Sequence, residues 1–275
     1  MSGAPSSCLL YGAQVHANGI RQHYLRYGGA GPVVVIVPGI TSPAVTWGFV
    51  AERFGRVFDT YVLDVRGRGL SEASDTLDYG LNACAADVAG FAAALGFERF
   101  HLVGHSMGAR IGIRMAARHK TALERLVLVD PPTSGPGRRR YPAQLPWYVD
   151  SIRLARHGIT VEQMRSFCPT WTEEQLRLRA QWLHTCDERA IVTTFDSFHQ
   201  DDIHADLPQL AVPTLLMGAE RGDVVSPADE AEFRTLCPGL ETTRVAGAGH
   251  MIPWDNEAGF YTGFGSFLGT ALPTA

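Results

Sequence analysis

The pentapeptide Gly104-His105-Ser106-Met107-Gly108 constrains the fold of this chain more than any other feature. It follows an apolar run at Phe100–Val103 and precedes a stretch with helical character at Ala109–Arg118. In such a strand–turn–helix context, a G-x-S-x-G sequence lifts a serine hydroxyl out of the end of a sheet. Side chains two positions to either side would collide with the sharp turn, so glycine is needed at both. We therefore expect Ser106 to be a nucleophile.

Short apolar runs alternate with helical patterns along most of the chain. Eight runs are typical of strands: Leu9–Val15, Ile20–Tyr27, Val33–Val37, Thr60–Leu63, Phe100–Val103, Arg125–Val129, Thr214–Met217 and Thr242–Val245. Four helical patterns lie among them, at Val45–Phe54, Leu81–Leu95, Ala109–His119 and Glu230–Thr235. This alternation predicts an α/β fold in which a mostly parallel, eight-stranded sheet has helices on both faces.

One stretch breaks the alternation. Between Asp130 and Pro213 no strand-like run occurs, and the segment instead carries helical patterns with start signals. Thr160 and Thr172 each begin a capping box, with glutamine three positions later. We expect residues 131–207 to form a helical lid over the carboxyl edge of the sheet, where ligands bind in open α/β folds. Residues 1–130 and 208–275 would then form the core.

Composition narrows the range of functions. The chain is 45% apolar, 19% charged and has a net charge of −4, which gives no global attraction to nucleic acid or to an anionic membrane. No apolar run is long enough to span a bilayer, and Met1–Cys8 lacks the regions of a signal peptide. Five scattered cysteines without C-x-x-C spacing favour the cytoplasm. No P-loop, H-E-x-x-H or Cys/His cluster occurs, so we expect no metal and no cofactor.

A serine nucleophile needs a base and an acid that orients the base. The base should follow the last strand, and His250 lies there in Gly247–Met251, where small residues allow a loop to approach the serine. Two carboxylates are candidates for the acid. Asp130 ends the strand at Arg125–Val129, and Asp223 follows the next strand, where hydrolases more commonly place their acid. The residues alone leave both open.

The oxyanion formed during acyl transfer needs backbone donors. One is expected from Met107, directly after the serine, and the other from the loop after the third strand. That loop is Pro38–Ser42, and the residue after its glycine is Ile40. We expect the Met107 and Ile40 N–H groups to form the oxyanion hole.

These motifs resemble those of the α/β-hydrolase superfamily over essentially the whole chain. Asp64–Ser71 is similar to the D-x-R-G-x-G-x-S loop of that superfamily, where Asp64 and Arg66 would have a structural role. Several segments look closest to the branch that deformylates N-formylmaleamate in aerobic nicotinate degradation: Val37–Pro43, Thr46–Gly48, Leu63–Gly69, Gly104–Arg110, Val129–Pro132, Leu145–Asp150 and Gly249–Trp254. In that branch the acid follows the sixth strand, so the resemblance favours Asp130. It implies a serine hydrolase that works through a formyl-serine intermediate.

The resemblance also implies a small anionic amide substrate, whose carboxylate needs a counter-group. The candidates are Thr41, Ser42, Arg110 and an arginine of the lid, with Trp147 among the aromatic residues that could form pocket walls. Two other functions fit the same motifs: a carboxylesterase or C–C bond hydrolase with the same triad, and a ligand-binding receptor on the hydrolase fold. The sequence does not define an oligomeric state.

Overall fold

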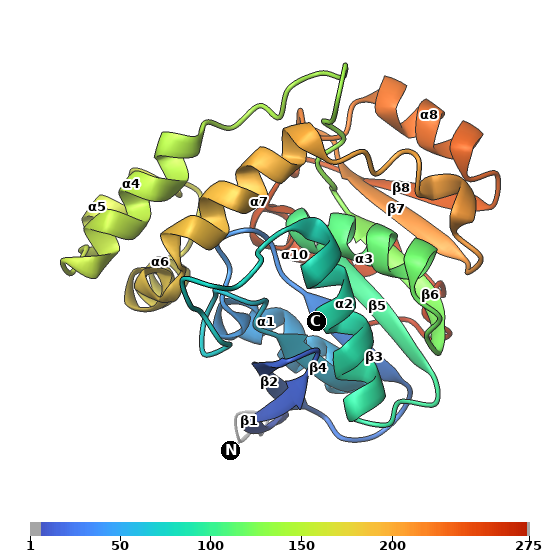
Figure 1. Ribbon diagram of the computed structural model, residues 1–275, viewed down its shortest axis with the longest axis horizontal. Helices are drawn as coiled ribbons and strands as arrows, with labels where there is room; N and C mark the ends of the chain where they lie inside the picture. The colour runs from blue at the N-terminus through green and yellow to red at the C-terminus, as the bar shows by residue number, and fades with distance from the viewer. Residues whose placement is uncertain (1–6, 274–275) are drawn as a thin grey trace.

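A single eight-stranded sheet forms the centre of the molecule, in the order β1-β2-β4-β3-β5-β6-β7-β8 (Figure 1). The computed structural model describes residues 7–273, so most of Met1–Cys8 lies outside the described residues. The strands are β1 Leu9–Ala17, β2 Ile20–Tyr27, β3 Val33–Val37, β4 Asp59–Leu63, β5 Phe100–His105, β6 Leu123–Val129, β7 Thr214–Ala219 and β8 Leu240–Val245. β2 pairs antiparallel with β1 and β4, and the other pairings are parallel. The predicted α/β class and eight-stranded sheet are confirmed.

Helices cover both faces of this sheet. On one face, α2 (Leu81–Ala94) packs beside α3 (Met107–Arg118), and Gly112 of α3 lies against Leu102 and Leu126. On the other face, α10 (Glu257–Phe264) approaches Met217 of β7 through Gly263 and packs against α1 (Gly48–Phe54). The small size of glycine at both contacts lets helix and sheet approach closely.

The helix predicted over Val45–Phe54 is interrupted. Its first part is a 3₁₀ turn, Ala44–Trp47, and α1 begins only at Gly48. The carbonyl oxygen of Pro43 accepts hydrogen bonds from both the backbone N–H and the hydroxyl of Thr46, at 2.9 and 2.7 Å. These two bonds tighten the chain into the 3₁₀ form, which commonly precedes an α-helix.

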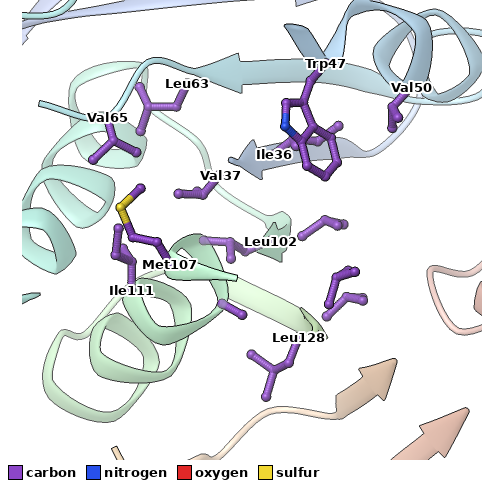
Figure 2. Close-up of a cluster of buried hydrophobic side chains, with 14 of the residues drawn as sticks. Ile36, Val37, Trp47, Val50, Leu63, Val65, Leu102, Met107, Ile111 and Leu128 are labelled. Atoms are coloured by element: carbon purple, nitrogen blue, oxygen red, sulfur yellow. The ribbon is translucent and has the colours of Figure 1, made fainter. Parts of the chain in front are cut away.

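The core positions the turn between β5 and α3. Figure 2 shows side chains of β3 between two groups, Trp47 and Val50 on one side and Met107 and Ile111 of α3 on the other. β4, β5 and β7 are buried along their whole length, as expected for parallel strands covered on both faces. Burying a large apolar side chain contributes roughly 1.5–3 kcal/mol, so this packing holds the start of α3 rigidly against the sheet.

Four helices without strands lie between β6 and β7, and we call this part of the chain the inserted segment. They are α4 Leu145–Arg156, α5 Val161–Arg165, α6 Glu173–Trp182 and α7 Glu188–Gln200. The helices α4 to α6 lie beyond the edge of the sheet, at the left of Figure 1. Both expected capping boxes are present, at Thr160 with Gln163 and at Thr172 with Gln175. The chain then continues through α8 (Pro227–Leu236) and α9 (Ile252–Asp255).

Candidate active site

Ser106 occupies the sharp turn between β5 and α3. Its backbone has φ 54° and ψ −115°, a region that non-glycine residues rarely adopt. The neighbouring glycines explain why the turn can form. A Cβ at Gly104 would lie 2.3 Å from the carbonyl oxygen of Gly108, and a Cβ at Gly108 would lie 1.9 Å from that of Val37. Both contacts are far inside van der Waals distance, so only glycine fits.

The side chains of Ser106, His250 and Asp130 form a continuous chain of hydrogen bonds. Ser106 Oγ lies 3.0 Å from His250 Nε2, and His250 Nδ1 lies 2.7 Å from Asp130 Oδ2. Asp130 is fully buried and its other oxygen accepts a bond from Ala219 N at 3.4 Å. A buried carboxylate at Nδ1 selects the tautomer that carries its proton there, which leaves Nε2 free to accept the serine proton. This arrangement suits nucleophilic attack by Ser106.

Asp223 does not take the place of the acid. It lines the same cavity, but His250 bonds Asp130, and Asp223 contributes its backbone carbonyl to Arg139. Asp130 reaches the histidine because β6 and β7 are neighbours and its backbone has a positive φ of 45°. That conformation turns its side chain toward the loop that carries His250.

His105, next to the nucleophile, holds the loop of the catalytic histidine. Its Nε2 donates a hydrogen bond to the His250 backbone oxygen at 3.0 Å, and Asp255 Oδ2 accepts one from Gly249 N at 2.8 Å. Burial, with a smaller contribution from His250, lowers the pKa of His105 to about 3. The ring therefore stays neutral, so it supports His250 without placing a second positive charge beside it.

The backbone donors expected for the oxyanion lie at the start of α3 and in the loop after β3. In residues 7–273, neither the Met107 N–H nor the Ile40 N–H donates to a backbone oxygen. Met107 is the first residue of α3, so its N–H has no partner within the helix. The carbonyl of Gly39, which belongs to the same peptide as the Ile40 N–H, accepts a bond from Ser42 N at 3.2 Å, and this fixes the orientation of the donor. Both donors are thus available to a developing negative charge.

A cavity of about 640 Å³ opens above the triad. Its walls come from the loop after β3, from the turn at Ser106, from the loop at His250 and from the inserted segment. The expected residues Thr41, Ser42 and Trp147 line it. The aromatic residues Tyr148, Phe167 and Trp171 line it as well. The inserted segment thus supplies a large part of the wall facing the nucleophile.

Arg179 of α6 is the buried cation of this cavity. Its guanidinium donates to the backbone and side-chain oxygens of Thr41, both at 3.1 Å, and lies over the rings of Trp147 and Trp171. Its Nε has no hydrogen-bond partner among the described residues. A buried guanidinium that rests on aromatic faces and neutral oxygens retains its positive charge for an incoming anion.

The placement of Arg110 corrects one expectation. It does not line the cavity, because its guanidinium is buried and donates to four backbone carbonyls, those of Pro132, Ser134, Ser197 and Asp201. These carbonyls lie at the two ends of the inserted segment. Arg110 therefore fastens the segment to α3 and is not available to bind a substrate.

Two side chains of the candidate site are not fully predicted by the sequence. The sequence predicts Arg179 only as an unspecified arginine of the lid, and it gives no signal for Tyr141. Tyr141 lines the cavity, and its hydroxyl oxygen lies 3.4 Å from His250 Nε2. It belongs to irregular chain between β6 and α4, where no motif marks a residue.

The described residues contain no group of three or more His, Cys, Asp or Glu side chains placed to hold a metal ion. Across residues 7–273, no helix has both the length and the apolar character needed to cross a bilayer.

Comparisons with known proteins identify the family of this chain. A family model described as the alpha/beta hydrolase fold matches residues 32–257. An N-formylmaleamate deformylase of Pseudomonas putida is 63% identical over 262 residues, covering 95% of this chain and 98% of that protein. A crystal structure of N-formylmaleamic acid deformylase from Pseudomonas putida S16 superposes with a TM-score of 0.89 at 55% identity, covering 92% of this chain and 99% of that one.

A more distant structure, that of E-2-(acetamidomethylene)succinate hydrolase, has a TM-score of 0.77 at 22% identity over 95% of this chain and all of that one. At that identity the likeness shows the fold alone. The family match spans most of the chain and the deformylase of Pseudomonas putida matches it almost end to end. The chain therefore belongs to the α/β-hydrolase fold family.

Proposed function

We propose that this protein is a serine hydrolase that cleaves the formyl amide of N-formylmaleamate to maleamate and formate, in aerobic nicotinate degradation. One observation carries the proposal. A hydrogen-bonded Ser106–His250–Asp130 chain opens into a cavity that holds a buried arginine, in a protein 63% identical to a deformylase along almost its whole length. The cavity thus offers both a nucleophile for the formyl carbon and a cation for a carboxylate.

The first half of the reaction forms a formyl-serine. His250 Nε2 takes the proton of Ser106 as its oxygen attacks the formyl carbon, and the Ile40 and Met107 N–H groups bind the oxyanion. When the C–N bond breaks, His250 returns the proton to the leaving nitrogen and maleamate departs. That nitrogen is flanked by a second carbonyl, which makes its expulsion easier than from a simple amide.

The second half regenerates the enzyme. A water molecule gives a proton to His250 Nε2 and attacks the formyl carbon of the formyl-serine. As the tetrahedral intermediate collapses, His250 returns the proton to Ser106 Oγ, and formic acid leaves and ionises to formate. Asp130 stabilises the protonated imidazole in both halves. No group outside the triad and the two backbone donors is needed to balance these steps.

Arg179 is the counter-group that we assign to the substrate carboxylate. It lines the same cavity as Ser106, and its Nε is unpartnered among the described residues. Trp147 and Trp171 lie against the guanidinium, and the burial of Arg179 strengthens its attraction for an anion. Thr41, whose oxygens accept bonds from Arg179, and Ser42 add hydroxyl groups to the same cavity.

We further propose that residues 131–207 act as a lid domain and that the enzyme works in the cytoplasm. The lid is supported by the cavity walls that the inserted segment supplies. The cytoplasmic location is supported by five free cysteines, none of them in a disulfide.

Formate release from N-formylmaleamate by the purified protein tests the proposal, with Ser106→Ala as the negative control. We expect turnover by the unaltered protein and none by the variant above the solution rate. Faster turnover of simple aryl esters than of N-formylmaleamate would instead indicate a carboxylesterase. Tight binding without turnover would indicate a receptor.

A further inference from the structure

Tyr141 places a phenol beside the reacting atoms, where the mechanism described above does not use it. Its oxygen lies 3.4 Å from His250 Nε2 and 3.1 Å from the Tyr148 oxygen. The ring is buried, and it packs edge-on against the rings of Phe198 and His250. These contacts hold the hydroxyl at the point where the inserted segment meets the triad.

The phenol of Tyr141 is protonated at neutral pH, so it can donate a hydrogen bond. Burial, the largest cause, raises the pKa of Tyr141 well above its ordinary value. Because the phenol stays protonated, it cannot serve as the base of the reaction. The remaining role for its hydroxyl is to donate to a neighbouring lone pair.

Either hydroxyl of the Tyr141–Tyr148 pair can be the donor. When Tyr148 donates to the Tyr141 oxygen, the single proton of Tyr141 is free to point toward the triad. There the lone pair of His250 Nε2 already accepts the serine proton. The lone pairs still free to accept the Tyr141 proton are those of Ser106 Oγ and, once substrate is bound, those of the leaving group.

The leaving atom must come within hydrogen-bond reach of His250 Nε2 in order to be protonated. A hydroxyl 3.4 Å from that nitrogen therefore borders the leaving group. We propose that Tyr141 is a further catalytic residue, which donates a hydrogen bond to the leaving group as its bond to the formyl carbon breaks. For N-formylmaleamate the acceptor is the amide that departs, whose carbonyl oxygen shares the developing negative charge.

This role involves no new bond to the tyrosine. The electron pair of the C–N bond moves to the departing amide, His250 supplies the proton to nitrogen, and Tyr141 keeps its own. For the amide substrate the inference rests on the proposed function. For any formyl compound it rests only on the triad, and this difference shapes the experiment.

The experiment compares Tyr141→Phe with the unaltered enzyme on N-formylmaleamate, an alkyl formate and nitrophenyl formate. All three give the same formyl-serine, so they differ only in the group that leaves. We expect kcat/KM to fall about 100-fold for the amide and the alkyl ester, the size of effect seen when one catalytic donor is removed. Nitrophenolate leaves without assistance, so nitrophenyl formate should stay within about 3-fold of the unaltered enzyme.

Tyr148→Phe is the matched control. It removes a buried hydroxyl that contacts Tyr141, one hydrogen bond further from the triad. We expect kcat/KM for the amide and the alkyl formate to fall less than in Tyr141→Phe, and kcat/KM for nitrophenyl formate to change little. Retained turnover of nitrophenyl formate by both variants also shows that they fold.

An equal loss on all three substrates would overturn the inference, because it would mean that Tyr141 positions Ser106 or His250. Unchanged turnover of the amide and the alkyl ester would overturn it as well. If the unaltered enzyme hydrolyses both esters but not N-formylmaleamate, the substrate assignment fails while the two esters still decide the role of Tyr141.

Discussion

Replacing Arg179 with methionine separates recognition of the substrate from the chemistry. Methionine keeps an unbranched apolar stem between Trp147 and Trp171 but removes the guanidinium. A hydrogen bond between charged groups contributes about 1.5–3 kcal/mol, and each 1.36 kcal/mol is a factor of ten. We therefore expect Arg179→Met to lower kcat/KM for N-formylmaleamate by about 10- to 150-fold.

The assay measures formate release from N-formylmaleamate and from a neutral alkyl formate by the same preparation. The neutral ester has no carboxylate, so its turnover should change little. The matched control is Arg177→Met, which removes the same charge from an exposed position on the same helix. That variant should resemble the unaltered enzyme on both substrates.

The ratio of kcat/KM for N-formylmaleamate to kcat/KM for the neutral formate decides the outcome. Arg179 also bonds Thr41, in the loop that carries the oxyanion donor. If its main effect were to hold that loop, Arg179→Met would slow both substrates equally, and the ratio would not move. That result, or an unchanged rate with N-formylmaleamate, would refute the reasoning.

Four other variants test the triad, the turn and the buried histidine. Asp130→Ala should lower kcat by about 10⁴-fold while Asp223→Ala keeps most activity, and the reverse order in formate release would contradict our assignment of the acid. Gly108→Ala would press a methyl group to 1.9 Å from a backbone oxygen of β3, so denaturation curves should show a loss of about 3 kcal/mol or more. The lowered pKa of His105 means that unfolding takes up a proton between pH 6.5 and about 3. The contribution of His105 to stability is therefore complete above pH 6.5 and declines toward pH 3 by up to about 1.4 kcal/mol per pH unit. In His105→Gln, the slope of the free energy of unfolding against pH over this range should be shallower by that amount.

The sequence predicted the architecture because the strands buried on both faces are mostly apolar. β2 and β3 have the predicted bounds, since turn residues flank both. β5 extends two residues further than predicted, through Gly104 and His105, because the motif that identifies the turn begins inside the strand. The predicted helix at Val45–Phe54 divides because hydrogen bonds to the Pro43 carbonyl, which no periodicity reveals, favour a 3₁₀ turn.

The candidate site could be predicted only where a motif fixes the geometry. Ser106 and His250 lie in short loops at known points of the fold. The acid remained open from the residues alone because it depends on which strands are neighbours and on the backbone conformation at Asp130. The position of Arg110 on α3 did not reveal that backbone carbonyls of the inserted segment would surround it. Tyr141 lies in irregular chain whose path depends on tertiary packing.

The inserted segment departs after β6 and returns before β7, two strands that are hydrogen-bonded neighbours. A longer, shorter or unrelated sequence could therefore replace the inserted segment at the same two points without changing how the strands of the sheet pair. Substrate preference could thus diverge, in evolution or by engineering, while the bond-cleaving groups of the core stay in place. A graft of this kind would have to preserve one requirement, main-chain oxygens at both junctions for the guanidinium of Arg110.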